Sequence, residues 1–342
     1  MSQRNAGVDF FRLLGACAVI FVHSIYANKV PMLVSLGRWA VPFFFMVSGY
    51  FFQKNFSKYS LYAFTKTIKS LLAILVSTNL FYLLFLFLTK GSLTGLANHF
   101  TLVVGTYFHL WFLTSLLLGY LVLWVFLRTN RQAILPYLAT LFVFFILALN
   151  PYSFLVGDKA HPLYARLLLS IPFLWLGFFV AKHTLQRYVS KPICWLLVSV
   201  GIGLQIVELW FLLGNRHDLL LVNFTVGTIP LSLGLFLLSL RTTVSPTNQL
   251  SHYGQRYSLQ LYLYHPVVNY YLYQALAQQR ADGLIYWLSP LLTILLTLSL
   301  LVLLDEITPT LFGILSGDFS RFDLVKSKSF LSDRLKTAIR LK

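Results

Sequence analysis

Long runs of apolar residues dominate this chain and limit what it can fold into. A helix needs about 20 mostly apolar residues to cross a hydrocarbon core of about 30 Å. Ten stretches of this kind occur, at approximately 7–26, 34–53, 68–89, 109–127, 133–150, 166–181, 193–213, 222–240, 257–277 and 284–304. We therefore expect an all-α fold, a polytopic membrane helix bundle of about ten transmembrane helices.

The composition excludes the other broad classes of protein. Hydrophobic residues make up 58% of the 342 residues and charged residues 11%. This is too apolar for a soluble globule or a disordered chain. The first stretch does not read as a cleaved signal peptide, because it holds Asp9 and Arg12 and lacks a small-residue cleavage site. Cys17 and Cys194 lie in separate apolar stretches, which predicts packing roles and no disulfide.

The distribution of charge indicates the orientation in the membrane. The chain has 27 Lys and Arg residues against 10 Asp and Glu. If the N-terminus lies inside, nineteen of the basic residues fall on the cytoplasmic side, and the outer side has only Lys29, Lys90, Lys159, Arg166, Arg216 and Arg280. The positive-inside rule then places both termini in the cytoplasm and favours an even number of spans. No basic patch interleaved with exposed aromatic residues is present, so we expect no nucleic-acid partner.

The domain organisation follows from the same pattern. We expect a transmembrane domain over residues 1–317 and a basic cytoplasmic tail over 318–342 that can lie on the anionic inner leaflet. No internal repeat and no appended soluble catalytic domain are evident in the sequence. The activity should therefore reside in the membrane bundle.

Ionisable residues inside the first apolar stretch need an explanation, because each costs at least about 2.5–3.5 kcal/mol in a bilayer. Arg12 and His23 are eleven residues apart, so on a helix they share a face and lie about 16 Å apart along its axis. They can address the two ends of one extended ligand. Alternatively, Arg12 extends to lipid phosphates with Asp9 as its partner, and His23 is an interfacial histidine.

Further polar residues recur in the other stretches. The candidates for substrate binding or support are Asp9, Arg38, Ser48, His109, Trp111, Glu208, Tyr262 and His265, with Lys66 and Lys69 at the inner end of the third stretch. The simpler alternatives are helix packing for Ser48, interfacial anchoring for Trp111 and topology signals for the two lysines. Glu208 must pair across helices, stay protonated or face water.

The expected orientation divides these residues into two groups. His23, Arg38, His109 and Glu208 fall in the outer half, whereas Arg12, Lys66 and Lys69 fall in the inner half. The bundle would then have cations at its cytoplasmic mouth and histidines deeper in the membrane. This arrangement suits an anionic ligand from the cytosol whose reactive end extends into the bundle. Acyl-coenzyme A has that shape.

These elements resemble the acyltransferase-3 family of bacterial membrane O-acyltransferases, which modify surface polysaccharides and lipid-linked sugars. The matching elements are GVDFFR with the R-x10-H spacing of Arg12 and His23, and VPFFFMVSGYFF in the second stretch. HLWFL at 109–113 and YSLQLYLYHP at 257–266 also match. The resemblance runs from residue 7 to about 305.

The resemblance implies a donor, an acceptor and a location. It implies acetyl-CoA as the acyl donor, a carbohydrate hydroxyl as the acceptor and a multi-pass protein in the bacterial cytoplasmic (inner) membrane. His23 would be the catalytic histidine and Arg12 its essential partner, and Arg12, Lys66 and Lys69 would hold the donor. Family members often carry arginines where this chain has the two lysines, and a lysine binds phosphate only as a point charge.

The chemistry assigns roles to some of these groups and leaves others open. A sugar hydroxyl needs a base as it attacks the thioester, and neutral imidazole suits this role near pH 7. Arg38, His109 or a backbone N–H near Pro42 can stabilise the oxyanion, and an acyl-histidine intermediate is an alternative to direct transfer. No metal motif is present. The competing function is a transporter or exporter of a surface-glycan precursor or acylated substrate.

Overall fold

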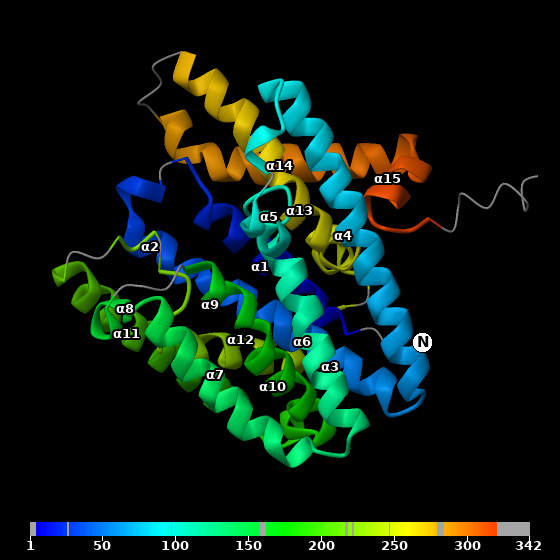
Figure 1. The fold of residues 1–342 in the computed structure, drawn as a ribbon, viewed down its shortest axis with the longest axis vertical. Coiled ribbons are helices and arrows are strands. Elements are labelled where there is room, and N and C mark those ends of the chain that lie inside the picture. Colours follow the sequence, from blue (N-terminus) through cyan, green and yellow to red (C-terminus); the bar gives the residue numbers. More distant parts are fainter. Residues whose placement is uncertain are drawn as a thin grey trace, which may run out of the picture.

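The computed structural model describes residues 5–25, 27–96, 98–157, 162–215, 218–220, 222–245, 247–278 and 284–319. Throughout these residues the regular structure is helical (Figure 1). The α-helices are α1 (Ala6–Val22), α2 (Pro31–Leu36), α3 (Ala40–Phe56), α4 (Ser60–Lys90), α5 (His99–Val104), α6 (Trp111–Arg128), α7 (Leu135–Leu149), α8 (Ser153–Val156), α9 (Pro162–Leu168), α10 (Ser170–Lys182), α11 (Lys191–Gly214), α12 (Thr228–Arg241), α13 (Gln249–Gln278), α14 (Leu284–Ile307) and α15 (Pro309–Leu315). Short 3₁₀ turns are η1 (Ala27–Lys29), η2 (Gly37–Trp39), η3 (Thr94–Leu96), η4 (Gln132–Ile134) and η5 (Leu185–Arg187).

Seven helical segments of the described chain are long and apolar enough to cross a membrane. They are Pro31–Phe56, Ser60–Lys90, Trp111–Arg128, Gln132–Leu149, Leu163–Lys182, Lys191–Gly214 and Leu284–Ile307. The remaining three expected spans coincide with α1, α12 and α13. The first has 17 residues, the second has 14, and the third is long but rich in polar residues. The all-helical membrane fold is confirmed, and the count of ten spans stays a prediction.

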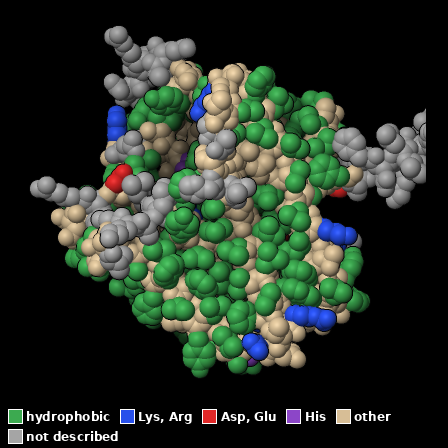
Figure 2. Space-filling model, viewed as in Figure 1, with side chains coloured by type: hydrophobic (Ala, Val, Ile, Leu, Met, Phe, Trp, Pro, Cys, Tyr) green, Lys and Arg blue, Asp and Glu red, His purple; other side chains and the backbone are tan. Residues whose placement is uncertain are grey.

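The outer faces of these helices are apolar, as a lipid environment requires. On α4, Leu80, Leu84 and Leu88 follow one another at helical spacing, and each is more than half exposed. Hydrophobic side chains cover most of the face shown in Figure 2, with the few Lys and Arg side chains near its edges. Such a continuous exposed apolar surface is typical of contact with lipid.

Helix α1 lies in the middle of the bundle (Figure 1), where it packs against α13 and α14 on one side and α3 and α12 on the other. The side chain of Asn5 begins it by accepting the N–H of Val8 at 3.1 Å. A Cβ at Gly254 of α13 would overlap the carbonyl of Asp9, so the glycine permits the close crossing of α13 and α1. This central position gives residues along α1 contact with several other helices.

Three expected spans begin or end differently from the apolar pattern. The first, expected over 7–26, ends as a helix at Val22. The second is interrupted at η2, before Pro42, which lies within the first turn of α3 where proline is tolerated. The eighth, expected over 222–240, becomes helical only at Thr228.

The remaining expectations on domain organisation stay predictions. The basic tail expected over 318–342 lies outside the described residues from residue 320 onward. The boundary between the transmembrane domain and the tail at residue 317, and the cytoplasmic location of both termini, therefore stay predictions.

Candidate active site

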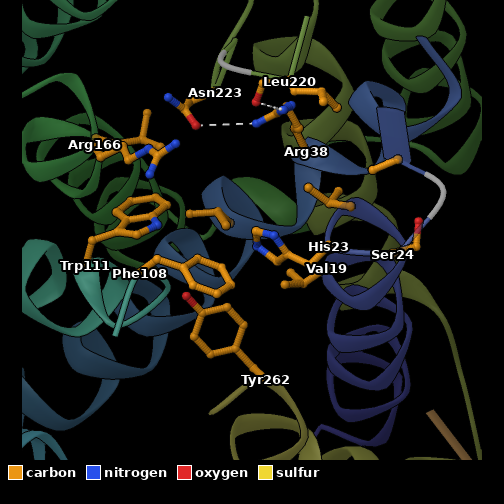
Figure 3. A pocket seen from close by; sticks show the side chains of 15 residues that line it. Val19, His23, Ser24, Arg38, Phe108, Trp111, Arg166, Leu220, Asn223 and Tyr262 are labelled. Carbon is orange, nitrogen blue, oxygen red and sulfur yellow. Dashed lines mark hydrogen bonds between the residues drawn. The ribbon is translucent and has the colours of Figure 1, made fainter. Parts of the chain in front are cut away.

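Two cavities lie along α1, one near each of its ends. The smaller has a volume of about 320 Å³ and is lined by His23, Arg38, Trp111 and Arg166, among others (Figure 3). The larger has a volume of about 1040 Å³ and is lined by Arg12, Ser48, Lys54 and Lys66, among others. Helix α3 passes from Arg38 just before its start to Lys54 near its end, so the two cavities lie toward opposite ends of the bundle. We call them the His23 cavity and the Arg12 cavity.

One side chain, Tyr262 of α13, lines both cavities. Its ring packs edge-on against Phe112, with ring centroids 5.2 Å apart. Its hydroxyl donates a hydrogen bond to the carbonyl oxygen of His109 at 2.6 Å. The separation between the two cavities at this point is therefore one aromatic side chain.

The position of His23 is fixed by the end of α1. His23 caps the helix, with its N–H donating to the carbonyls of Val19 and Ile20. Its own carbonyl accepts from the side-chain amide of Asn269 at 3.0 Å, and Asn269 in turn accepts from the hydroxyl of Thr293 at 2.7 Å. Helices α13 and α14 thus hold the backbone of His23, which leaves its imidazole to project into the cavity (Figure 3).

Three histidines from separate elements gather beside this cavity. The rings of His23 and His265 are stacked, with centroids 5.7 Å apart and 21° between their planes. The ring of His109 lies 5.9 Å from that of His265. His109 and His265 are fully buried, whereas His23 is partly exposed to the cavity.

Pro266 explains how the two buried histidines are held. Proline has no N–H, so the carbonyl of Tyr262, four residues earlier, loses its helical partner. The Nδ1 of His265 takes this place at 2.7 Å. The next carbonyl, of Leu263, accepts from the Nε2 of His109 at 2.8 Å and from the hydroxyl of Tyr82 at 2.7 Å.

These bonds also fix the tautomers of the two histidines. A carbonyl oxygen can only accept a hydrogen bond, so the proton lies on Nε2 of His109 and on Nδ1 of His265. The other ring nitrogen of each is buried and has no hydrogen-bond partner among the described residues. The single N–H of neutral His109 is therefore occupied, which argues against His109 as the donor to an oxyanion.

The opposite wall of the His23 cavity carries Arg38 and Arg166. Arg38, in η2, donates to the carbonyls of Leu219 and Leu220 at 3.3 and 2.7 Å and to the side chain of Asn223 at 3.4 Å. The guanidinium of Arg166 lies over the ring of Trp111, 5.8 Å from its centre. Trp111, one candidate for an interfacial anchor, is thus buried in the cavity wall.

A break between α9 and α10 brings Arg166 to this place. The hydroxyl of Ser115 in α6 donates to the carbonyl of Leu167 at 2.9 Å and accepts the N–H of Ser170 at 3.2 Å. These bonds replace helical hydrogen bonds at the junction. In the sequence Arg166 counted only as an outer-side charge, because the break in the sixth span was not predicted.

The Arg12 cavity contains several of the expected donor-binding residues. Arg12 pairs with Asp9 at 3.5 Å, one turn away on α1. Ser48 lines the cavity, and its carbonyl accepts from the hydroxyl of Tyr120 at 3.3 Å. Lys66 lines the mouth, together with Lys54 and Lys58, which in the sequence had only marked the inner side.

Two sequence candidates lie away from the cavities. Lys69 is exposed and lines neither cavity. Glu208 of α11 accepts the N–H groups of Val226 and Gly227, at 2.9 and 3.1 Å, and the hydroxyl of Tyr152. It pairs across helices and holds the start of α12, which indicates a structural role.

Within the described part of the chain, no group of three or more His, Cys, Asp or Glu side chains is arranged to hold a metal. The arrangement that is present is an imidazole in one cavity and a set of cations in another, with His23 at the end of the same helix α1 that carries Arg12. Imidazole, guanidinium and lysine groups in such cavities are the groups that a membrane-embedded transferase of an anionic donor needs. Residues 5–305 match the family described as an acyltransferase domain, and the chain belongs to this acyltransferase-3 family.

Two curated relatives are similar to this chain. A serine/alanine racemase of Enterococcus gallinarum is 27% identical over 299 residues, which cover 77% of this chain and 41% of that protein. An amino-acid racemase of Enterococcus faecalis is 29% identical over 143 residues, covering 38% of this chain and 20% of that protein. The chain thus spans less than half the length of either relative. No solved structure matches.

Proposed function

We propose that this membrane acyltransferase transfers an acetyl group from cytosolic acetyl-CoA to a hydroxyl of a cell-surface or lipid-linked carbohydrate. The observation that carries the proposal is the pair of cavities separated by Tyr262, with Arg12 in one and His23 in the other. The donor enters the Arg12 cavity, where Lys54, Lys58 and Lys66 face its phosphates. Its thioester then reaches the level of Tyr262.

In this proposal His23 is the general base. The acceptor occupies the His23 cavity, and the imidazole takes the proton of its hydroxyl as the oxygen attacks the thioester carbonyl. The C–S bond breaks as the ester bond forms, and the departing thiolate of coenzyme A takes up a proton. Arg38 or Arg166 supplies donors to the oxyanion, in keeping with the occupied N–H of His109.

The proposal includes the setting of the enzyme. It is a protein of the bacterial inner membrane with ten spans and both termini in the cytoplasm, so that the lysine-lined mouth faces the acetyl-CoA pool. The asymmetry of the basic residues and the family membership support this orientation. Labelling of single cysteines introduced at Lys58 and at Gly91 from either side of the membrane tests it.

The experiment uses purified protein in proteoliposomes with acetyl-labelled acetyl-CoA and lipid-linked glycan from the source cells. Wild-type protein should release coenzyme A and label the glycan. His23→Ala should lose about 10²–10⁴-fold in transfer rate, the usual contribution of general-base catalysis, while still binding acetyl-CoA. The matched control is His183→Ala, since His183 caps α10 and lines neither cavity. Normal transfer by His23→Ala would overturn the assignment of the base.

The second candidate function is a transporter or exporter of a glycan precursor or an acylated substrate. Two cavities toward opposite ends of the bundle, with a barrier one side chain thick, are also what alternating access requires. The same proteoliposomes distinguish the two functions. Movement of intact labelled substrate across the membrane without release of coenzyme A would favour the transporter.

A further inference from the structure

The wall of the His23 cavity carries two guanidinium groups, whereas the proposed reaction needs donors from only one of them for its oxyanion. Arg38 and Arg166 line it from two different elements (Figure 3) and are close enough to interact electrostatically with each other and with His23. Among the described residues that line the cavity, none is acidic. Two cations facing a small cavity repel one another unless a negative charge lies between them.

Neither guanidinium is neutralised within the described part of the chain. Arg38 forms no ion pair there, and its hydrogen bonds all go to neutral oxygens. Asp218 influences Arg38 electrostatically, but its carboxylate accepts the N–H of Leu220 and does not line the cavity. The charge of Arg38 is therefore available to a ligand.

Arg166 is more open to a ligand than Arg38. No described residue accepts a hydrogen bond from it, and its Nε is buried without a partner, as is the Nε of Arg38. Among the described residues, its guanidinium lies over the aromatic face of Trp111. Burying part of an unpaired guanidinium is costly, and a charge-assisted bond to an anionic group of a ligand offsets this cost.

We infer that Arg38 and Arg166 form an oxyanion-binding subsite, so that the acceptor carries a carboxylate or phosphate group beside the hydroxyl that is acylated. This inference rests on the proposed function for the identity of the ligand as acceptor. The cavity volume of about 320 Å³ is at the lower end of the range for small-molecule sites and suits a unit of monosaccharide size. A guanidinium pair binds the flat array of two or three oxygens of such a group.

The test compares three probes of one size: methyl glucuronoside with a carboxylate, glucose 6-phosphate with a phosphate, and neutral methyl glucoside. Dissociation constants are measured by calorimetry on the full chain in nanodiscs, without acetyl-CoA. At least one of the two anionic probes should bind about tenfold or more tightly than the neutral probe, as charge-assisted hydrogen bonds predict. The better of the two identifies the anionic group of the acceptor.

Two substitutions of Arg166 locate the effect. Arg166→Gln should abolish the preference for the anionic probe, and Arg166→Lys should keep part of it, because a lysine retains the charge but loses the planar fork. Arg166 holds no described backbone group, so these variants should fold. Arg38→Gln removes bonds to the carbonyls of Leu219 and Leu220 and is used only if its thermal midpoint matches that of wild type.

Equal binding of all three probes to wild type would overturn the inference. A preference for the anionic probe that persists in Arg166→Gln would also overturn it, because other residues would then bind the anionic group. Binding of an anionic probe that depends on Arg166, in a protein that transfers no acetyl group, would uphold the subsite and reject the proposed function. The binding and transfer measurements therefore separate the two.

Discussion

The imidazole rings of His23 and His265 lie stacked, 5.7 Å apart between centroids and 21° from parallel. No hydrogen bond joins the two rings, so His265 contacts His23 through its ring face and can hold the orientation of that ring. His265 is itself locked by its bond to the carbonyl of Tyr262. This relationship makes His265 a positioning residue for the proposed base.

The first prediction concerns this stack. His265→Leu should lower kcat by about tenfold to a hundredfold, the range expected when a reacting group is misplaced by about 1 Å, with the KM for acetyl-CoA unchanged. Rates of acetyl transfer are compared with the rate at which diethyl pyrocarbonate modifies His23. His252→Leu is the control, since His252 is exposed at the start of α13. A raised KM with unchanged kcat would contradict the positioning role.

The second prediction separates two neighbouring lysines. Lys66→Glu should raise the KM for acetyl-CoA by about three- to tenfold, because the reversed charge repels the donor's phosphates, and the effect should shrink at high salt. Lys69→Glu, the matched control, should leave the KM unchanged because Lys69 lines neither cavity. Equal increases in the KM for acetyl-CoA in the two variants would show that only the overall charge at this end of the bundle affects donor binding.

The third prediction treats Glu208 as a structural residue. Glu208→Ala leaves the N–H groups of Val226 and Gly227 without their acceptor and should destabilise the protein by about 2–3 kcal/mol. Glu208→Gln keeps an acceptor oxygen and should cost about 1 kcal/mol. Unfolding in detergent with added denaturant measures both. Loss of transfer in Glu208→Gln at unchanged stability would assign Glu208 a direct role in the reaction.

The fourth prediction concerns the crossing of α3 and α10. A Cβ at Gly177 would overlap the carbonyl of Met46, which is backbone and cannot yield easily. Gly177→Ala should therefore cost about 1–3 kcal/mol through overpacking. Gly203→Ala on α11, where a Cβ meets nothing within 4 Å, should be neutral or stabilise by up to about 1 kcal/mol. Thermal midpoints of the two variants in one detergent provide the comparison.

The arrangement of helices was largely predictable because long apolar runs leave few alternatives. All ten expected stretches coincide with helices, including the polar α13. The errors arose where a side chain from another helix replaces a helical hydrogen bond. Glu208 takes the N–H groups just before α12, and Ser115 divides the sixth span into α9 and α10. Such tertiary bonds leave no periodic signal in the sequence.

The sequence predicted which residues belong to the candidate site better than it predicted which of them lie close together. Placing polar residues in an outer or inner half assigned His23, Arg38 and His109 to one group. In the structure His23 and Arg38 line one cavity, and His109 lies beside it next to His265. The same argument placed Glu208 with them, although it faces another helix. Arg166 was missed because a cation near a span end ordinarily indicates topology only. Depth in the membrane follows from sequence position, whereas direction around a helix depends on packing.

The ring of Tyr262 also has an electrical consequence. Moving one elementary charge through a membrane potential of 100 mV is worth about 2.3 kcal/mol. The ring of Tyr262 lies between the His23 cavity and the Arg12 cavity. It packs against Phe112, which in turn packs against Phe44. We expect the rings at this level to limit the passage of water and ions between the His23 cavity and the Arg12 cavity.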